Sequence, residues 1–140
     1  MSLTPPTPEQ AAGFLDTVAL DKGFMGTILS PSSGSQGARI MDLERMERFL
    51  EARPFDDFVA AGYRLSVNYV DFGLLADWLE DAVGDQELSQ EVRILHNSGE
   101  VFGALAPKVK ALLIERIAQC QDALGIEREP VSDPASPVAP

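Results

Sequence analysis

A chain of 140 residues, 45% hydrophobic and 24% charged, is long enough to bury a core in one domain, and its composition excludes a wholly disordered chain. Eleven Lys and Arg against 22 Asp and Glu give a net charge of -11, which repels nucleic-acid phosphates. The single cysteine, Cys120, excludes an internal disulfide, and no run of about eighteen apolar residues is present to cross a membrane. We therefore expect a cytoplasmic protein that binds neither nucleic acid nor membranes.

One domain is expected over residues 8–125, between two flexible tails. Residues 1–7 are rich in Pro, Ser and Thr and show no hydrophobic periodicity, which predicts a mobile N-terminal tail. Residues 126–140 end in PVSDPASPVAP and carry too little apolar surface to offset the entropy of ordering. A third break, SPSSGSQG at residues 30–37, lacks large apolar side chains and predicts an exposed loop.

The first predicted helix begins after Thr7. A threonine followed by Pro8 and then by Gln10 is typical of a capping box, in which the cap and the third helical residue each bond the other's backbone. Gly23 is placed to take the left-handed conformation that ends a helix. The apolar side chains of this helix share one face: Ala11, Phe14, Leu15 and Val18.

A second amphipathic helix is predicted over residues 38–52. Charged residues lie opposite its apolar stripe, which consists of Leu43, Met46, Phe49 and Leu50. The helix should end near Arg53, because Pro54 disfavours the α conformation in the residue before it. A short helix at residues 55–61, with Gly62 as its cap, is expected to follow.

Residues 63–70 support two interpretations. Alternation of apolar and polar residues favours a strand, with Tyr63, Leu65, Val67 and Tyr69 on one face. Alternatively, Ser66 caps a longer helix whose apolar face is Val67, Val70, Leu74, Leu75, Trp78, Leu79 and Val83. We favour the helix because its apolar face has more members. Any strand is expected to be confined to residues 63–70 and 24–29.

The C-terminal half carries the longest apolar stripe. Its members recur every three or four positions: Leu88, Val92, Leu95, Phe102, Ala106, Val109, Leu113, Ile117, Cys120 and Leu124. Residues 97–99 and Pro107 interrupt it, so two or three helical segments are expected, the last closed by Gly125. Together these patterns predict an all-α fold, a compact bundle of about five to six helices covering more than half of the chain.

Two stretches of the chain resemble a known family. These are EQAAGFLDTVALD at residues 9–21 and FVAAGYRLS at residues 58–66, and they are similar to the Nif11 family of small helical domains. That family is found among nitrogen-fixation-associated proteins and in leader regions of ribosomally made peptide natural products. The resemblance implies a recognition module without catalysis, and it supplies no catalytic or metal-binding residue to carry over.

The sequence offers no recognisable catalytic or cofactor-binding motif. It has neither a phosphate-binding P-loop nor a dinucleotide-binding glycine pattern. Cys120 belongs to the apolar stripe and is interpreted as a core thiol. His96 is the only histidine, and no serine lies in a nucleophile elbow. We therefore predict a protein that is not an enzyme and that holds no cofactor or metal.

The strongest charge feature is an acidic run in the C-terminal half. Its members are Asp71, Asp77, Glu80, Asp81, Asp85, Glu87 and Glu91. The run is either a solvated helix face or a docking face for a basic partner, with Phe72 and Trp78 as aromatic anchors. Trp78 fits the core stripe equally well. The candidate partner-binding residues are Phe72, Asp77, Trp78, Glu80, Asp81 and Asp85.

These observations favour a protein that works by binding another protein with a basic surface, as an adaptor, assembly factor or regulator. A Nif11-type precursor peptide is a second hypothesis, although residues 126–140 contain no Cys or Thr for thioether or heterocycle chemistry. An acidic mimic of nucleic acid that occupies a basic groove is a third. The partner and the oligomeric state are left open by the sequence.

Overall fold

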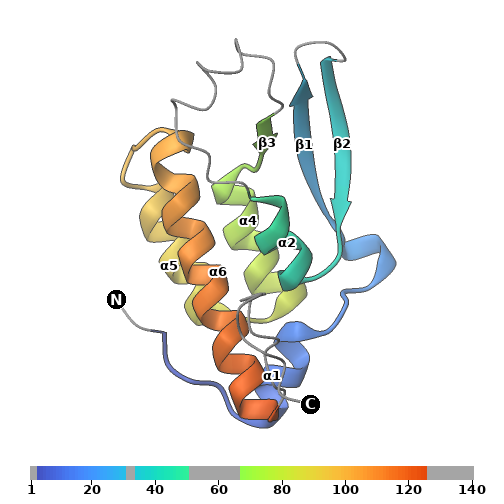
Figure 1. Ribbon diagram of the computed structural model, residues 1–140, viewed down its shortest axis with the longest axis vertical. Coiled ribbons are helices and arrows are strands. Elements are labelled where there is room, and N and C mark those ends of the chain that lie inside the picture. Colours follow the sequence, from blue (N-terminus) through green and yellow to red (C-terminus); the bar gives the residue numbers. More distant parts are fainter. Residues whose placement is uncertain (1–2, 31–33, 51–66, 126–140) are drawn as a thin grey trace, which may run out of the picture.

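The structure is a computed structural model, and it describes residues 3–30, 34–50 and 67–125. This part of the chain combines five α-helices with a three-stranded antiparallel sheet, so the fold is mixed α/β and the prediction of an all-α bundle is wrong. Helices make up 62% and strands 16% of it. Figure 1 shows α4, α5 and α6 standing together on one side and the β1–β2 hairpin on the other, with α2 between them. The helices are α1 (Pro8–Leu15), α2 (Leu43–Phe49), α4 (Phe72–Trp78), α5 (Gln86–His96) and α6 (Phe102–Leu124).

The start of α1 agrees with the sequence, but its end does not. The Thr7 hydroxyl accepts a hydrogen bond from the backbone N–H of Gln10, and the side-chain oxygen of Gln10 accepts one from the backbone N–H of Thr7, so the predicted capping box is confirmed. The helix ends at Leu15 because its C-cap Asp16 is extended, so Val18 lies outside α1, contrary to the prediction. Gly23 has an ordinary negative φ of -66° and follows one 3-10 turn, η1 (Leu20–Lys22).

The segment before α1 differs from the flexible tail expected there. Leu3 is buried in the hydrophobic core, and the following residues lie along α6 towards α1. We name residues 3–7 the strap. The strap is neither helix nor strand, so its sequence shows no hydrophobic periodicity. Side chains of α5 and α6 hold it in place through hydrogen bonds.

The sheet contains β1 (Phe24–Ser30), β2 (Gly34–Ile40) and β3 (Val67–Tyr69), in the order β2-β1-β3. Phe24 pairs with Ile40, and Ser30 pairs with Gly34. Strand β2 therefore consists of residues 34–37, which were predicted as part of a loop, and residues 38–40, which were predicted as the start of a helix. The loop predicted at residues 30–37 is therefore wrong for residues 34–37, and the helix predicted from Ala38 begins only at Leu43. The physical reason is that pairing with β1 stabilises a β2 sequence that has little strand propensity of its own.

The strand interpretation of residues 63–70 is confirmed for β3, where Tyr69 pairs with Thr27 of β1. Helix α4 begins afterwards, and its cap is Asp71, whose carboxylate accepts hydrogen bonds from the backbone N–H groups of Gly73 and Leu74. The favoured helix from residue 66 is therefore wrong at its start and correct from Phe72 onwards. Residues 63–66, the helix predicted at 55–61 and the tail predicted at 126–140 lie outside the described residues.

The C-terminal half follows the predicted stripe closely. Helix α4 runs into a wide π-helical turn, η2 (Leu79–Val83), which Gly84 ends with a φ of 83°. Gly125 closes α6 with a φ of 70°, as predicted. Pro107 does not interrupt α6, because in the second turn of a long helix it removes only one backbone hydrogen bond.

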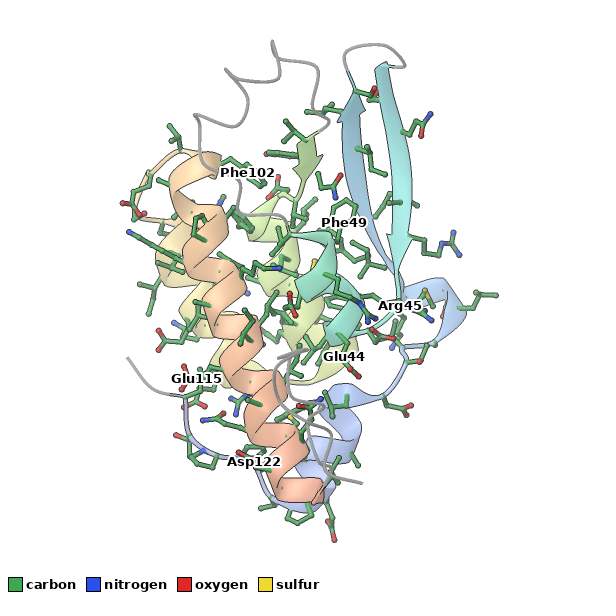
Figure 2. All side chains as sticks on the ribbon, in the orientation of Figure 1. Glu44, Arg45, Phe49, Phe102, Glu115 and Asp122 are labelled. Carbon is green, nitrogen blue, oxygen red and sulfur yellow. The ribbon has the colours of Figure 1, made fainter. Side chains whose placement is uncertain are left out.

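The core lies between α2, the helices α4 to α6 and one face of the sheet. Leu113 and Ile117 are both buried, which confirms them as core residues. The hairpin approaches α2 closely at Gly26, where a Cβ atom would lie 2.7 Å from Cε2 of Phe49. Figure 2 shows the Phe49 side chain between α2 and the hairpin. None of the described helices is long and apolar enough to span a lipid bilayer.

Candidate functional site

The two aromatic residues considered as interface anchors lie in the core. Trp78 is 7% exposed; its ring meets Phe24 edge to face at 5.9 Å between centroids, and its Nε1 donates to the carbonyl of Lys22 at 2.8 Å. Phe72 is 3% exposed and stacks on Phe102 at 5.2 Å between centroids. Both rings stabilise the fold and neither offers a surface to a partner, so the anchor role expected of them is replaced by a core role.

The acidic candidates occupy different environments. Asp77 and Glu80 are exposed and lie 3.2 and 3.4 Å from the guanidinium of Arg93. Asp81 is also exposed, on η2. Asp85 is buried and caps α5, where its carboxylate accepts a hydrogen bond from the backbone of Leu88. The structure thus places Asp77 and Glu80 around one arginine and puts Asp85 inside the protein.

The single histidine and the single cysteine occupy different environments. His96 is exposed at the end of α5. Cys120 is buried on α6, as predicted, and burial raises the pKa of its thiol to about 11, although the charge of Arg116 acts in the opposite direction. A thiol with this pKa is not a nucleophile at neutral pH. Within the described ranges, no group of three or more His, Cys, Asp and Glu residues is placed to hold a metal ion.

The exposed side of the sheet carries a row of apolar side chains. Met25 and Leu29 share one face of β1 with Thr27, and Tyr69 lies opposite Thr27 in β3. The three large side chains are 56% (Met25), 43% (Leu29) and 39% (Tyr69) exposed. We name Met25, Leu29 and Tyr69 the outer sheet face. Met25 and Leu29 lie on the reverse of the face that packs on α2, whereas the ring of Tyr69 also contacts Phe102 of α6, at 4.9 Å between centroids.

Strand β2 forms one edge of the sheet, and no strand within residues 3–30, 34–50 and 67–125 pairs with its outer side. Residues 34–37 of this strand, two of which are glycines, are exposed. Residues 24–40 contain no Asp or Glu and a single base, Arg39, in a chain whose net charge is -11. The hairpin is thus a locally neutral and partly apolar surface on an acidic protein.

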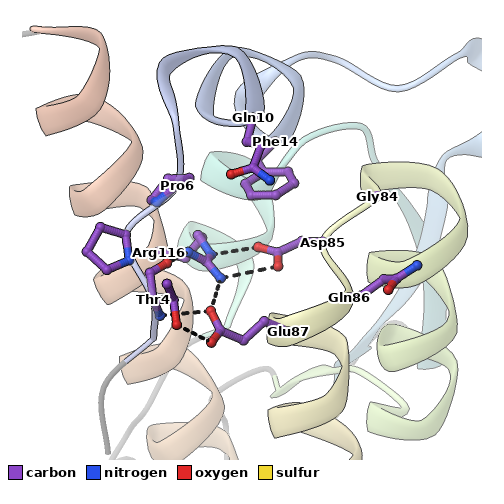
Figure 3. Close-up of a pocket in the computed structure, with 10 residues that line it drawn as sticks. Thr4, Pro6, Gln10, Phe14, Gly84, Asp85, Gln86, Glu87 and Arg116 are labelled. Atoms are coloured by element: carbon purple, nitrogen blue, oxygen red, sulfur yellow. Dashed lines mark hydrogen bonds and ion pairs between the residues drawn. The ribbon is translucent and has the colours of Figure 1, made fainter.

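At the other end of the molecule, Arg116 lies at the centre of a buried polar cluster, which Figure 3 shows. Arg116 is 2% exposed and extends from α6 towards the start of α5. Its Nε lies 2.6 Å from Oδ2 of Asp85, an ion pair whose atoms do not form an aligned hydrogen bond. The remaining guanidinium nitrogens donate to Glu87 at 2.7 Å, to Gln119 at 3.0 Å and to the carbonyl of Thr4 at 2.7 Å.

Beside this cluster is an open cavity of about 430 Å³. Pro5 and Pro6 of the strap form one wall, and Gln10 and Phe14 of α1 form another. The ring of Phe14 lies 5.4 Å from the guanidinium carbon of Arg116, a cation–π contact that fixes the arginine from the side of α1.

The two carboxylates beside Arg116 have pKa values shifted in opposite directions. Burial raises the pKa of Asp85 above its ordinary value, and the hydrogen bond from the backbone of Leu88 and the attraction of Arg116 offset this only in part. Burial acts in the same direction on Glu87, but the hydrogen bonds from Thr4 and Arg116 outweigh it and lower the pKa of Glu87. The more exposed carboxylate is therefore the more firmly ionised of the two.

The sequence analysis missed Arg116 as a central residue. A signal was present, because Val109, Leu113, Arg116 and Cys120 follow one another at spacings of four, three and four, so a charged residue occupies a core position of the stripe. Its two terminal guanidinium nitrogens donate four hydrogen bonds, to Thr4, Gln119, Asp85 and Glu87, and its Nε lies 2.6 Å from Oδ2 of Asp85 without an aligned hydrogen bond. Arg116 therefore holds the strap, α5 and α6 together.

In comparisons with known proteins, no protein-family model, no curated protein and no solved structure matches this chain.

Proposed function

We propose that this chain is a non-enzymatic protein-binding module, an adaptor or regulator, that receives an extended segment of a partner protein along the outer edge of β2. The observation that carries the proposal is the combination of an edge strand without a partner strand in the described residues and an adjoining outer sheet face left exposed. An edge strand presents a row of backbone N–H and C=O groups to which an extended peptide adds as a further strand.

The sheet next to this edge supports binding rather than solubility alone. Met25 and Leu29 on β1, the strand beside β2, form an apolar row on one face of the sheet with Tyr69 on the far strand β3, and small residues of β2 leave backbone groups accessible. Main-chain hydrogen bonds would supply affinity, and the apolar row would select side chains at alternate positions of the partner segment. Residues 24–40 carry no acid, so a neutral or basic segment meets no unfavourable charge there beyond Arg39.

Charge is the second part of the proposal. A net charge of -11, with Asp77, Glu80 and Asp81 exposed on α4 and η2, favours a partner whose surface is basic, because the long-range field speeds encounter. In this proposal the acidic residues steer the partner and the sheet holds it. We also propose the reducing cytoplasm as the compartment, a proposal supported by the single buried cysteine.

The nucleic-acid mimic has weaker support than protein binding. Such a mimic needs a continuous row of exposed carboxylates, whereas Asp85 is buried and Glu87 is bound to Arg116 and Thr4. No observation on the described residues favours the precursor-peptide hypothesis over a binding module.

The test compares the sheet with two other surfaces. The sheet variant Met25→Glu/Leu29→Glu is matched by Ile94→Glu/Ile114→Glu, which makes the same change at exposed helix positions. A third variant, Asp77→Asn/Glu80→Gln/Asp81→Asn, removes the exposed acids. Each protein is used to capture binding partners from its native host, with quantitative mass spectrometry, and affinities are then measured with the purified partner.

We expect the sheet variant to bind the partner at least about tenfold more weakly, equivalent to about 1.4 kcal/mol, and the matched helix variant to bind as the wild type does. The acid-to-amide variant should associate more slowly and with a weaker dependence on salt. A partner retained by the sheet variant but lost by the acid-to-amide variant would contradict β2 as the docking edge and would place docking on α4 and η2.

A further inference from the structure

A second cavity lies where β3, the end of α5 and the starts of α4 and α6 meet. We name it the aromatic cavity, and the residues of its lining used below are Tyr69, Asp71, His96, Glu100 and Phe102. Its volume is about 180 Å³. Pockets that hold drug-sized ligands measure about 300–1,000 Å³, so this cavity suits a group of the size of one side chain.

Two aromatic rings form an apolar wall of the aromatic cavity. Tyr69 of β3 and Phe102 of α6 lie 4.9 Å apart between centroids, with their planes tilted by 40°. Figure 2 shows Phe102 at the start of α6. The buried Phe72 stacks on Phe102 at 5.2 Å and holds its ring in place, while Tyr69 is exposed. The faces of such rings attract cations, so this wall is ready to receive a positively charged group.

Hydrogen-bond acceptors line the same cavity. Oδ1 of Asp71 caps α4, and its Oδ2 makes no hydrogen bond within the described residues. His96 and Asp71 both approach Gly73, where a Cβ atom would lie 3.0 Å from Nε2 of His96 and 3.3 Å from Oδ1 of Asp71. Glu100 pairs with Lys108 at 2.9 Å, an exposed ion pair of the kind that contributes little free energy.

The charge of the lining is negative. Two carboxylates belong to it, and no lysine or arginine is among the described residues that line the cavity. The whole chain has a net charge of -11, so a cation is attracted from a distance as well as at the site. Aromatic rings together with carboxylates match an organic cation, because the rings bind its face and the carboxylates accept from its N–H groups.

We infer that the aromatic cavity binds the guanidinium group of an arginine side chain of a partner protein. A guanidinium is flat, so its face stacks on the rings of Tyr69 and Phe102 while the N–H groups at its edge donate to Asp71. A neutral imidazole accepts through one ring nitrogen, so His96 provides a further acceptor. A lysine ammonium has neither the flat face nor the fork of donors, and it fits this combination less well.

This site is separate from the docking edge of the proposed function. In the order β2-β1-β3, the aromatic cavity lies at the β3 side of the sheet and the docking edge lies at β2. The inference therefore does not need a peptide to add to β2. It is tested with a small probe on the purified chain, so the failure of one proposal leaves the other to its own experiment.

The probe is the tripeptide acetyl-Gly-Arg-Gly-amide, titrated into the ¹⁵N-labelled full chain at constant ionic strength. We expect saturable shifts of the amide signals of Tyr69, Gly99 and Phe102, with a Kd of about a millimolar. The citrulline tripeptide has nearly the same shape without the charge, and the lysine tripeptide has the charge without the planar fork. Each should bind at least about fivefold more weakly than the arginine tripeptide.

Two variants locate the binding. Asp71→Asn removes one charge, and asparagine caps helices as well as aspartate does, so α4 should keep its start. It should weaken binding of the arginine tripeptide at least about fivefold, whereas Asp81→Asn, the matched change at an exposed acid of η2, should not. Tyr69→Val removes one ring at a strand position and should weaken binding to a similar degree.

Four results would overturn the inference. They are equal binding of the arginine and citrulline tripeptides, equal binding of the arginine and lysine tripeptides, equal effects of Asp71→Asn and Asp81→Asn, and shifts that do not saturate. Free L-arginine decides the source of the group: its own carboxylate is repelled by Asp71 and Glu100, so it should bind more weakly than the tripeptide. Tighter binding of the free amino acid would indicate a small-molecule site and would contradict a partner protein as the source.

Discussion

The surroundings of Arg116 and the β1–β2 hairpin differ in how their polar groups find hydrogen-bond partners. Arg116 and Asp85 are buried, and the polar groups around them face partners inside the protein. Along β2 most residues are exposed, and within the described residues the outer edge has no strand beside it. The first region fixes one arrangement of the chain, and the second leaves backbone groups open to another molecule. The stability of the fold should therefore depend strongly on the first region and weakly on the second.

Replacing Arg116 should have the largest effect on stability. Arg116→Met leaves Asp85 buried without its cation, which we expect to destabilise the protein by about 3–5 kcal/mol, measured by chemical denaturation. Arg93→Met is the matched control, since Arg93 pairs with exposed acids, and should cost less than about 1 kcal/mol. Equal losses of unfolding free energy in the two variants would show that the buried ion pair of Arg116 stabilises the protein no more than the exposed ion pairs of Arg93.

Truncating the core should have the next largest effect. Leu113→Ala removes a fully buried side chain and should cost about 2–5 kcal/mol. Ile114→Ala is the adjacent control on α6, because this side chain is 47% exposed, and it should change the free energy of unfolding by about 0.5 kcal/mol or less. A loss below about 0.5 kcal/mol for Leu113→Ala would contradict its place in the core.

The two carboxylates beside Arg116 should give opposite contributions to the dependence of stability on pH. The pKa of Glu87 is lowered from its ordinary 4.5, so its contribution is present above that value and is lost as pH falls through the folded pKa. The pKa of Asp85 is raised from 3.8, so between 3.8 and its folded pKa the native state binds more protons and stability falls as pH rises.

Paired melting curves between about pH 3 and pH 7 measure this difference. The stability gap between the wild type and Glu87→Gln should narrow as the pH falls below 4.5. The Asp85→Asn variant should lack the decline that the wild type shows as pH rises above 3.8. Parallel curves for the wild type and both variants would contradict the assigned shifts.

The hairpin should show the smallest effect. Met25→Ser and Leu29→Thr change side chains that are already about half exposed, so each should alter the free energy of unfolding by about 0.5 kcal/mol or less. The same substitutions should weaken binding of a partner segment. Substitutions in the hairpin should therefore change binding more than stability, whereas those around Arg116 should change stability. A loss of several kcal/mol would mean that the outer sheet face is covered in the folded chain.

The part of the fold that sequence patterns could predict is the part with helical periodicity. The capping box of α1, the core position of Leu113 and the cap at Gly125 were all accessible, because each depends on residues a few positions apart. Strand β2 was not accessible, since its sequence reads as a loop and only pairing with β1 makes it a strand.

The candidate site was still harder to predict. The contact between the strap and Gln119 joins residues 116 positions apart, and nothing local in the strap indicates that it is held. From the sequence Trp78 could be placed on a core stripe or in an interface, and its burial, its contact with Phe24 and its hydrogen bond to Lys22 place it in the core. An arginine in an apolar stripe was the one visible sign of the buried cluster.

The close approach of the hairpin to α2 also makes the orientation of the hairpin sensitive to substitutions at the contact. Since a methyl group on Gly26 would lie 2.7 Å from Cε2 of Phe49, Gly26→Ala must tilt the hairpin outwards or turn the aromatic ring aside. Phe49→Leu would make room for that methyl group. The orientation of the hairpin relative to α2 therefore depends on the absence of a side chain at Gly26 and on the position of the Phe49 ring. A substitution at either residue can change the orientation of β2 without altering any residue of β2.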